Sequence, residues 1–140
     1  MLPLQEISDR LEIGDLVARY STFIDGRRWD ELDALFTDDA VLDYTATGAI
    51  RGSLPELQAF FAEMLPAFLA TQHLTGASTV VVDGDRATAT TPCFNPMVVN
   101  EQQVFFVGLW YDDVLVRSPD GWRFAERTQR RAYVHEPARS

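Results

Sequence analysis

The sequence predicts an α+β domain in which three N-terminal helices pack on a strongly curved, mostly antiparallel sheet that encloses an apolar pocket. Apolar residues recur at helical spacing in the first part of the chain, up to about residue 65. From residue 73 onward the pattern changes to the alternation typical of strands, interrupted by turn residues. Helices followed by such a sheet pack on one of its faces, and bulky apolar residues along one strand face allow the sheet to curl around a cavity.

The helical part divides into three segments. Apolar residues at helical spacing define the first segment: Ile7, Leu11, Leu16, Val17, Tyr20 and Ile24. Gly26 ends this helix, and a shorter helix is expected over residues 29–36. Ser53 and Glu56 form a capping-box pattern that begins a third helix, and this helix runs to about Leu65 because Pro66 follows.

The sheet begins with a short strand over residues 40–44 and continues after residue 73 as a meander. Strands at 79–82 and 86–91 flank Asp83-Gly84, a pair typical of tight hairpins because it accepts positive φ. Longer strands are expected at 104–117 and 122–133, with a turn at 118–121 between them.

Size, charge and hydropathy limit the classes of function. The 140 residues suit one domain spanning residues 1–140, and a net charge of −9 argues against a nucleic-acid partner. No stretch approaches the roughly 18 apolar residues that span a bilayer, and the start does not resemble a signal peptide. A cytoplasmic location without membrane contact is therefore expected. The basic residues concentrate near the end and are expected to mark the solvent face of the last strand: Arg123, Arg127, Arg130, Arg131 and Arg139. Residues 136–140 are expected to form a frayed tail.

Neither a metal nor a cofactor is indicated. Cys93 is the one cysteine, so it forms no intramolecular disulfide, and a lone cysteine is more typical of a small buried hydrophobe than of a nucleophile. The chain has no glycine-rich phosphate loop and no pair of residues at metal-ligand spacing.

Among the titratable residues, His73 and Asp25 have the least ordinary positions. His73 lies among apolar neighbours at the entrance to the meander, where it is either a buried structural imidazole or a general base. Asp25 ends the first helix, where the helix dipole disfavours a carboxylate. Its side chain either pairs with an arginine of the following loop or accepts a hydrogen bond from an imidazole. His135, in the polar tail, is expected to be solvated.

Hydroxyl and carboxyl groups add further candidates. Tyr44, on the first strand, and Tyr20, on the first helix, are either core aromatics or hydrogen-bond donors inside the pocket. Either Asp112 or Asp113 is expected to face inward, because neighbouring residues of a strand point to opposite faces.

Two parts of the sequence resemble the SnoaL-like superfamily, which shares the fold of nuclear transport factor 2. The opening part consists of ARY at residues 18–20, IDGRRWDEL at 24–32 and LFTDDA at 35–40, and the closing part is RSPDGWRF at 117–124. The resemblance extends over nearly the whole chain and implies a cone-shaped α+β barrel. As a signal of function it is weak, since one fold hosts many chemistries.

Within this superfamily, the branch of scytalone dehydratase and lindane dehydrochlorinase is the most similar. Those enzymes pair an aspartate with a histidine at the positions of Asp25 and His73, and Tyr44 matches a pocket tyrosine of scytalone dehydratase. Met97 stands where scytalone dehydratase has a second histidine, which argues against the same dehydration. Ketosteroid isomerases have their oxyanion-hole tyrosine at the position of Tyr20, but Tyr44 replaces their catalytic aspartate.

The resemblance implies a cofactor-independent lyase or isomerase that acts on a small apolar cyclic molecule. His73 would abstract a proton, Asp25 would orient His73, and Tyr44 would donate to the developing anion. The residues expected to bind the substrate are Tyr20, Phe94, Met97, Phe106 and Trp110. The alternatives are a non-catalytic binding protein that uses the same cavity and an accessory subunit of a larger oxygenase. Self-association as a homo-oligomer, either a dimer or a trimer, is expected because a curved sheet leaves an apolar outer face to be covered.

Overall fold

A computed structural model describes residues 1–136, which form helical segments packed against one mixed sheet. The helical segments are α1 (Leu4–Asp25), η1 (Trp29–Leu35), η2 (Thr45–Thr47), α2 (Leu54–Met64) and η3 (Leu65–Ala67). The strands are β1 (Phe36–Asp43), β2 (Arg51–Ser53), β3 (Ala70–Thr71), β4 (Leu74–Thr75), β5 (Thr79–Asp83), β6 (Arg86–Asn100), β7 (Gln103–Ser118) and β8 (Gly121–His135). Arg139 and most of the expected tail lie outside the described residues.

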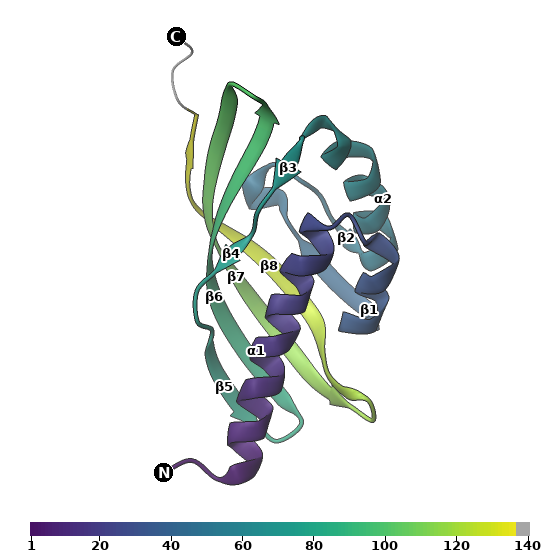
Figure 1. The fold of residues 1–140 in the computed structure, drawn as a ribbon. Helices are drawn as coiled ribbons and strands as arrows, with labels where there is room; N and C mark the ends of the chain where they lie inside the picture. Colours follow the sequence, from purple (N-terminus) through teal and green to yellow (C-terminus); the bar gives the residue numbers. More distant parts are fainter. Residues whose placement is uncertain (137–140) are drawn as a thin grey trace.

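The long strands β6, β7 and β8 form the centre of the sheet, whose order is β2-β1-β8-β7-β6-β3, with β4 and β5 also paired to β6. Only the β1–β8 pairing is parallel among the pairings of residues 1–136; the others are antiparallel. Figure 1 shows α1 lying across one face of this bent sheet and α2 beside β1 and β2. The α+β class and the curved, mostly antiparallel sheet expected from the sequence are confirmed.

The two α-helices begin and end largely where the sequence predicts. Along α1 the buried side chains include Ile13, Leu16, Tyr20 and Ile24, which recur at helical spacing. At the start of α2, Ser53 and Glu56 form the expected capping box, with each side chain bonded to the other residue's backbone N–H. No helix among residues 1–136 is both long and apolar enough to span a bilayer.

The expected second helix is instead the 3₁₀ segment η1. Its apolar side chains are Trp29, Leu32 and Leu35, spaced by three residues, and Leu32 and Leu35 are buried. Three residues make one turn of a 3₁₀-helix, so this conformation directs all three side chains to one side. A wider α-helical turn would rotate them away from the core.

Strand β6 continues through Pro92 and Pro96, although the sequence predicts its end at residue 91. The carbonyls of Pro92 and Pro96 accept from the backbone N–H groups of Gly76 and Gln72, at 2.9 and 3.1 Å. In an antiparallel strand the N–H and C=O of one residue point to the same side. The missing donors of both prolines therefore face the short, interrupted strands β3 and β4, so the β6–β7 ladder is left intact.

Candidate active site

Asp25 and His73 are brought together between the end of α1 and the segment that joins β3 to β4. The Nδ1 atom of His73 lies 2.6 Å from Oδ1 of Asp25, and the backbone N–H of His73 donates to Oδ2 at 2.7 Å. Since the carboxylate only accepts, Nδ1 carries the hydrogen in this bond. This tautomer leaves the lone pair of Nε2 available to a molecule in the cavity that His73 lines.

Further contacts hold the carboxylate of Asp25 in place. Thr71 donates its hydroxyl to Oδ1 of Asp25 at 3.0 Å, and the guanidinium of Arg27 donates to that hydroxyl at 3.1 Å. Burial raises the pKa of Asp25, but the hydrogen bonds from His73 and Thr71 outweigh it, so the pKa lies below its usual value. Arg27 has a φ of 58°, an uncommon backbone conformation for a residue other than glycine, in the loop that follows the aspartate. No arginine among the described residues forms an ion pair with Asp25, whose partner is the imidazole.

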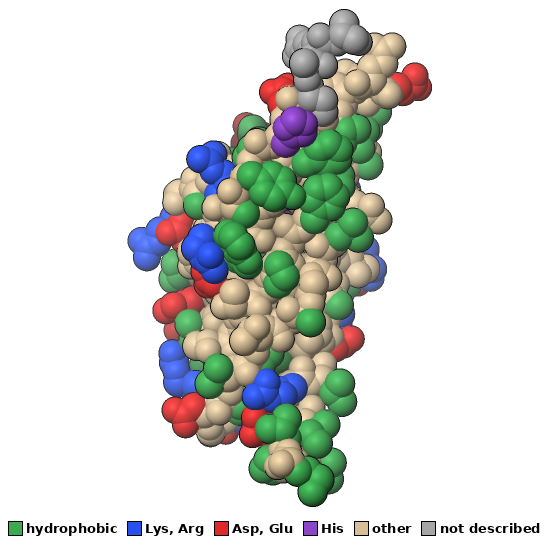
Figure 2. Space-filling model, turned by 90° about the vertical axis from the view of Figure 1, so that its left-hand side faces the viewer, with side chains coloured by type: hydrophobic (Ala, Val, Ile, Leu, Met, Phe, Trp, Pro, Cys, Tyr) green, Lys and Arg blue, Asp and Glu red, His purple; other side chains and the backbone are tan. Residues whose placement is uncertain are grey.

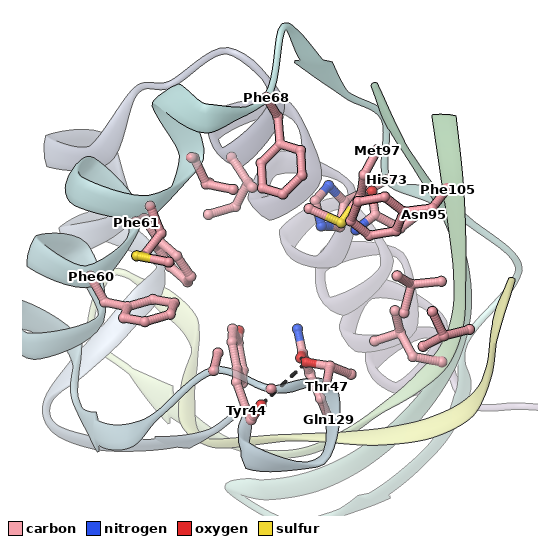
Figure 3. Close-up of a pocket in the computed structure, with 18 of the residues that line it drawn as sticks. Tyr44, Thr47, Phe60, Phe61, Phe68, His73, Asn95, Met97, Phe105 and Gln129 are labelled. Carbon is pink, nitrogen blue, oxygen red and sulfur yellow. Dashed lines mark hydrogen bonds between the residues drawn. The ribbon is translucent and has the colours of Figure 1, made fainter. Parts of the chain in front are cut away.

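A cavity of about 290 Å³ lies between the inner face of the sheet, α1 and α2, and its wall is mainly apolar (Figure 3). The size falls at the lower end of the range for small-molecule sites. The apolar side chains of the wall include Ile24, Phe60, Phe61, Met64, Leu65, Phe68, Met97, Phe105, Val107 and Leu109. The polar side chains of the wall are Tyr20, Tyr44, Thr47, His73, Asn95 and Gln129.

Tyr20 and Tyr44 meet in the cavity wall, where their hydroxyl oxygens lie 2.5 Å apart. One hydroxyl donates to the other, so the second O–H remains available as a donor. Burial raises the pKa of Tyr20 to about 12 and that of Tyr44 well above its usual value. Both hydroxyls therefore keep their protons at neutral pH, as a hydrogen-bond donor to a developing anion must.

The prediction that Phe94, Phe106 and Trp110 line the cavity is wrong. These three side chains lie on the outer face, the face of β6 and β7 that points away from α1. Phe94 stacks on Phe106 at 5.5 Å between ring centroids, and Trp110 packs on Arg130. Asn95 and Met97 occupy the inward positions of β6, so alternation turns Phe94 outward. Tyr20 and Met97 line the cavity as expected.

Asp113 is the inward-facing member of the Asp112–Asp113 pair, but it lies in the core and not in the cavity wall. It forms an ion pair with Arg127 at 3.2 Å, and both side chains are fully buried. Burial raises the pKa of Asp113 to about 7, against the opposing effect of Arg127. The guanidinium of Arg127 packs against the rings of Tyr111 and Tyr20, at 3.7 and 4.2 Å from their centroids. The expectation that Arg127 lies on the solvent face is therefore wrong.

Sequence reasoning missed three polar residues of the wall: Thr47, Asn95 and Gln129. Thr47 and Gln129 hydrogen-bond to each other, and the amide nitrogen of Gln129 lies 3.4 Å from the hydroxyl of Tyr111. Asn95 stands between two prolines of β6, where the sequence gives no alternating pattern that would show which way it points. The sequence holds one signal for Gln129: it is an uncharged residue two positions from both Arg127 and Arg131 on the last strand.

Other reactive groups do not converge on the cavity. Within residues 1–136, no group of three His, Cys, Asp or Glu side chains is placed to hold a metal ion. Cys93 is buried, and burial raises the pKa of its thiol to about 12, so the thiol remains protonated.

Residues 5–128 match the family model of the SnoaL-like domain, and the chain belongs to this family. An uncharacterised protein of Mycobacterium tuberculosis is 48% identical over 135 residues, which cover 95% of this chain and 92% of the relative. Among solved structures, the Kfla4162 protein of Kribbella flavida has a TM-score of 0.85 at 26% identity, covering 93% of this chain and 95% of its own.

Two solved structures that are named for an enzyme activity share the fold. A putative scytalone dehydratase of Novosphingobium aromaticivorans has a TM-score of 0.84 at 18% identity, covering 96% of this chain and 91% of its own. A hexachlorocyclohexane dehydrochlorinase of Novosphingobium barchaimii has a TM-score of 0.83 at 20% identity, covering 96% of this chain and 94% of its own. At these identities the likeness shows the fold alone.

Proposed function

We propose that this protein is a lyase or isomerase that uses His73 to take a proton from a small, mainly apolar ring compound. The observation that carries the proposal is the Asp25–His73 hydrogen bond at 2.6 Å beside an apolar cavity. A histidine held in one tautomer by a carboxylate is the arrangement that general-base catalysis requires. Two proteins of the same fold, named as a putative scytalone dehydratase and a hexachlorocyclohexane dehydrochlorinase, support this class of reaction.

Each group has a separate role in the scheme. Nε2 of His73 accepts the proton, and the carboxylate of Asp25 stabilises the imidazolium that results. Tyr44, hydrogen-bonded to Tyr20, donates its hydroxyl to the charge that develops on the substrate. The aromatic wall positions the ring and excludes water, which strengthens these electrostatic interactions. The scheme needs no cofactor.

Proton exchange with solvent tests the proposal without knowledge of the natural product. The protein is incubated in D₂O with a panel of cyclic ketones, cyclic alcohols and chlorinated rings, and deuterium incorporation or elimination is followed by NMR. Wild type should exchange or transform at least one compound, and His73→Ala should abolish the activity with an unchanged melting temperature. His135→Ala is the matched control, since His135 is an exposed histidine at the end of β8. Activity that survives in His73→Ala would sink the proposal.

The second candidate is a protein that binds a ligand in this cavity without transforming it. The observation in its favour is the wall itself, in which Phe60, Phe61, Phe68 and Phe105 supply apolar contact but no chemistry. The two functions give different results with the same panel. Saturable binding without proton exchange or transformation of any bound compound would favour the non-catalytic binding protein.

A further inference from the structure

Asn95 is a buried residue whose amide oxygen has no hydrogen-bond partner among the described residues. Its side chain lines the cavity and is 6% exposed, and within residues 1–136 its Oδ1 has no hydrogen-bond partner. A buried polar atom without a partner costs free energy, and a strand residue facing an apolar wall is ordinarily apolar. The amide is therefore placed to meet a polar atom of whatever occupies the cavity.

The register of the sheet puts this amide next to the imidazole of His73. Thr71 pairs with Met97 and Leu74 with Phe94, so the intervening position 73 lies opposite position 95. Side chains directly opposite on antiparallel strands have Cβ atoms about 4.5–5.5 Å apart. Figure 3 shows His73 and Asn95 in the same part of the cavity, and both line it.

The other polar groups of the wall have protein partners. Thr47 and Gln129 pair with each other, and Tyr20 pairs with Tyr44. Figure 3 shows Tyr44, Thr47 and Gln129 across the cavity from His73 and Asn95. Apart from His73, two wall residues next to Asn95 in the sheet are apolar: Met97 along β6 and Val107 opposite on β7.

We propose that Asn95 is a specificity-determining residue and that the substrate is a hydroxyl-bearing ring compound whose hydroxyl binds Asn95 beside His73. The inference rests on the proposed function, because it takes the ligand of this cavity to be the substrate. A hydroxyl both donates and accepts, so it satisfies the amide whichever way its oxygen and nitrogen are turned. A halogen or a methyl group in the same place leaves the amide unpaired. Sites built to hydrogen-bond a substrate hydroxyl discriminate strongly against analogues that lack it.

The test compares two ligands of the same outline, 2-naphthol and 2-methylnaphthalene, in ¹⁵N NMR titrations of the full chain. Wild type should bind the naphthol roughly tenfold to a hundredfold more tightly. Asn95→Leu, which is nearly isosteric, should lose this preference. The side-chain amide signals of Asn95, assigned in wild type by triple-resonance NMR, should move as the naphthol saturates wild type. Equal affinity of wild type for the two ligands, or amide signals that stay in place at saturation, would overturn the proposal.

Two controls separate this result from others. Asn100→Leu makes the same change at an exposed end of β6 and should keep the preference for the naphthol. The amide signals of wild type decide the question even if Asn95→Leu does not fold. If wild type exchanges no proton of any compound in the panel but still prefers the naphthol, the catalytic function is rejected and the recognition of a hydroxyl by Asn95 stands.

Discussion

Asp25 stands at the C-terminal end of α1, where the helix dipole disfavours a negative charge. The compensation comes from three donors outside the helix: the imidazole and backbone N–H of His73 and the hydroxyl of Thr71. Because these bonds favour the charged form, the pKa of Asp25 lies below its usual value in spite of burial. The side chain is therefore an ionised carboxylate over the whole neutral range, as an acceptor that orients an imidazole has to be.

Replacing Asp25 by asparagine tests this orientation. The amide keeps the shape of the side chain but removes the charge that selects the tautomer and stabilises the imidazolium, so turnover should fall by about 10⁴-fold. The rate of proton exchange measures the effect, with the melting temperature as a check on folding. Asp15→Asn, on an exposed part of the same helix, should leave the rate unchanged. Near-normal turnover in Asp25→Asn would show that the carboxylate has only a structural role.

Tyr44→Phe removes one member of the hydroxyl pair and should lower turnover by roughly 10²-fold, with little change in substrate affinity. Tyr20→Phe should have a smaller effect, because Tyr44 keeps its own hydroxyl in the cavity. Since the pKa of Tyr20 is about 12 and that of Tyr44 is also raised, the wild-type profile of rate against pH should show no tyrosine ionisation below pH 10. A loss of activity between pH 8 and 10 that disappears in Tyr44→Phe would contradict this assignment.

The sequence was informative about the residues that carry charge or a family motif and uninformative about the neutral polar ones. The helix end, the apolar surroundings and the family resemblance all indicate Asp25 and His73. Asn95 and Gln129 gave no such signal. Whether an amide faces a cavity depends on which alternate positions of its strand point inward. Around Asn95 the alternation cannot be followed in the sequence, because two prolines stand close to it.

At the level of elements, strand phase also explains the misplaced aromatic residues. Met97 and Phe94 are three residues apart, so a regular strand directs them to opposite faces. Phe106 and Trp110 lie opposite Pro96 and Pro92 of β6, and so they share the outer face with Phe94. The composition and the two-residue alternation predict that the strands exist. Which of the alternating side chains point inward can be assigned only when one inward-facing residue is known.

Asp9 links α1 to the last hairpin and gives this contact a pH dependence. Its carboxylate accepts from Arg117 at 2.7 and 3.0 Å and from the indole of Trp122 at 3.0 Å. The bonds from Arg117 hold the pKa of Asp9 well below its usual value. A folded-state pKa below the unfolded value stabilises the fold above the unfolded pKa, and this stabilisation is lost as the pH falls through the folded-state pKa.

Asp9→Asn should therefore be less stable than wild type at pH 7, and the difference should shrink as the pH is lowered from about 5 toward 2. Urea unfolding at a series of pH values measures the difference in free energy of unfolding between the two proteins. Asp15→Asn is again the control and should show a small difference that does not vary with pH. A constant gap between Asp9→Asn and wild type would mean that packing of the side chain, and not its charge, holds the hairpin on α1.

At the scale of the molecule, the outer face leaves apolar side chains exposed that a soluble monomer ordinarily covers (Figure 2). Phe94, Leu74 and Tyr133 are each more than a third exposed there, beside Trp110. Self-association therefore stays a prediction, now assigned to this face. Sedimentation equilibrium should show an oligomer for wild type and a lighter species for Phe94→Ser. A monomeric wild type at all concentrations would contradict the assignment.

The buried pair of Arg127 and Asp113 joins the sheet to α1 through the ring of Tyr20, and its contribution depends on both charges being present. Removing one charge leaves the other buried without compensation, so Arg127→Met should lower the free energy of unfolding by roughly 3–5 kcal/mol. Because burial has already raised the pKa of Asp113 to about 7, the aspartate avoids this cost at low pH by taking up a proton. The penalty in Arg127→Met should accordingly grow as the pH rises from about 5 to 8.

The double variant Arg127→Met, Asp113→Leu separates charge from packing. Apolar side chains of similar volume often replace a buried ion pair without loss, so the second substitution should restore most of the stability that the first removes. Urea unfolding at pH 5 and pH 8 of wild type, both single variants and the double variant completes the cycle. If the double variant is no more stable than Arg127→Met, the guanidinium stabilises the fold through its contacts with the rings of Tyr20 and Tyr111. If stability returns, the ion pair is replaceable in the fold, and the reason for a cation beneath the tyrosines must be sought in the activity of the variants.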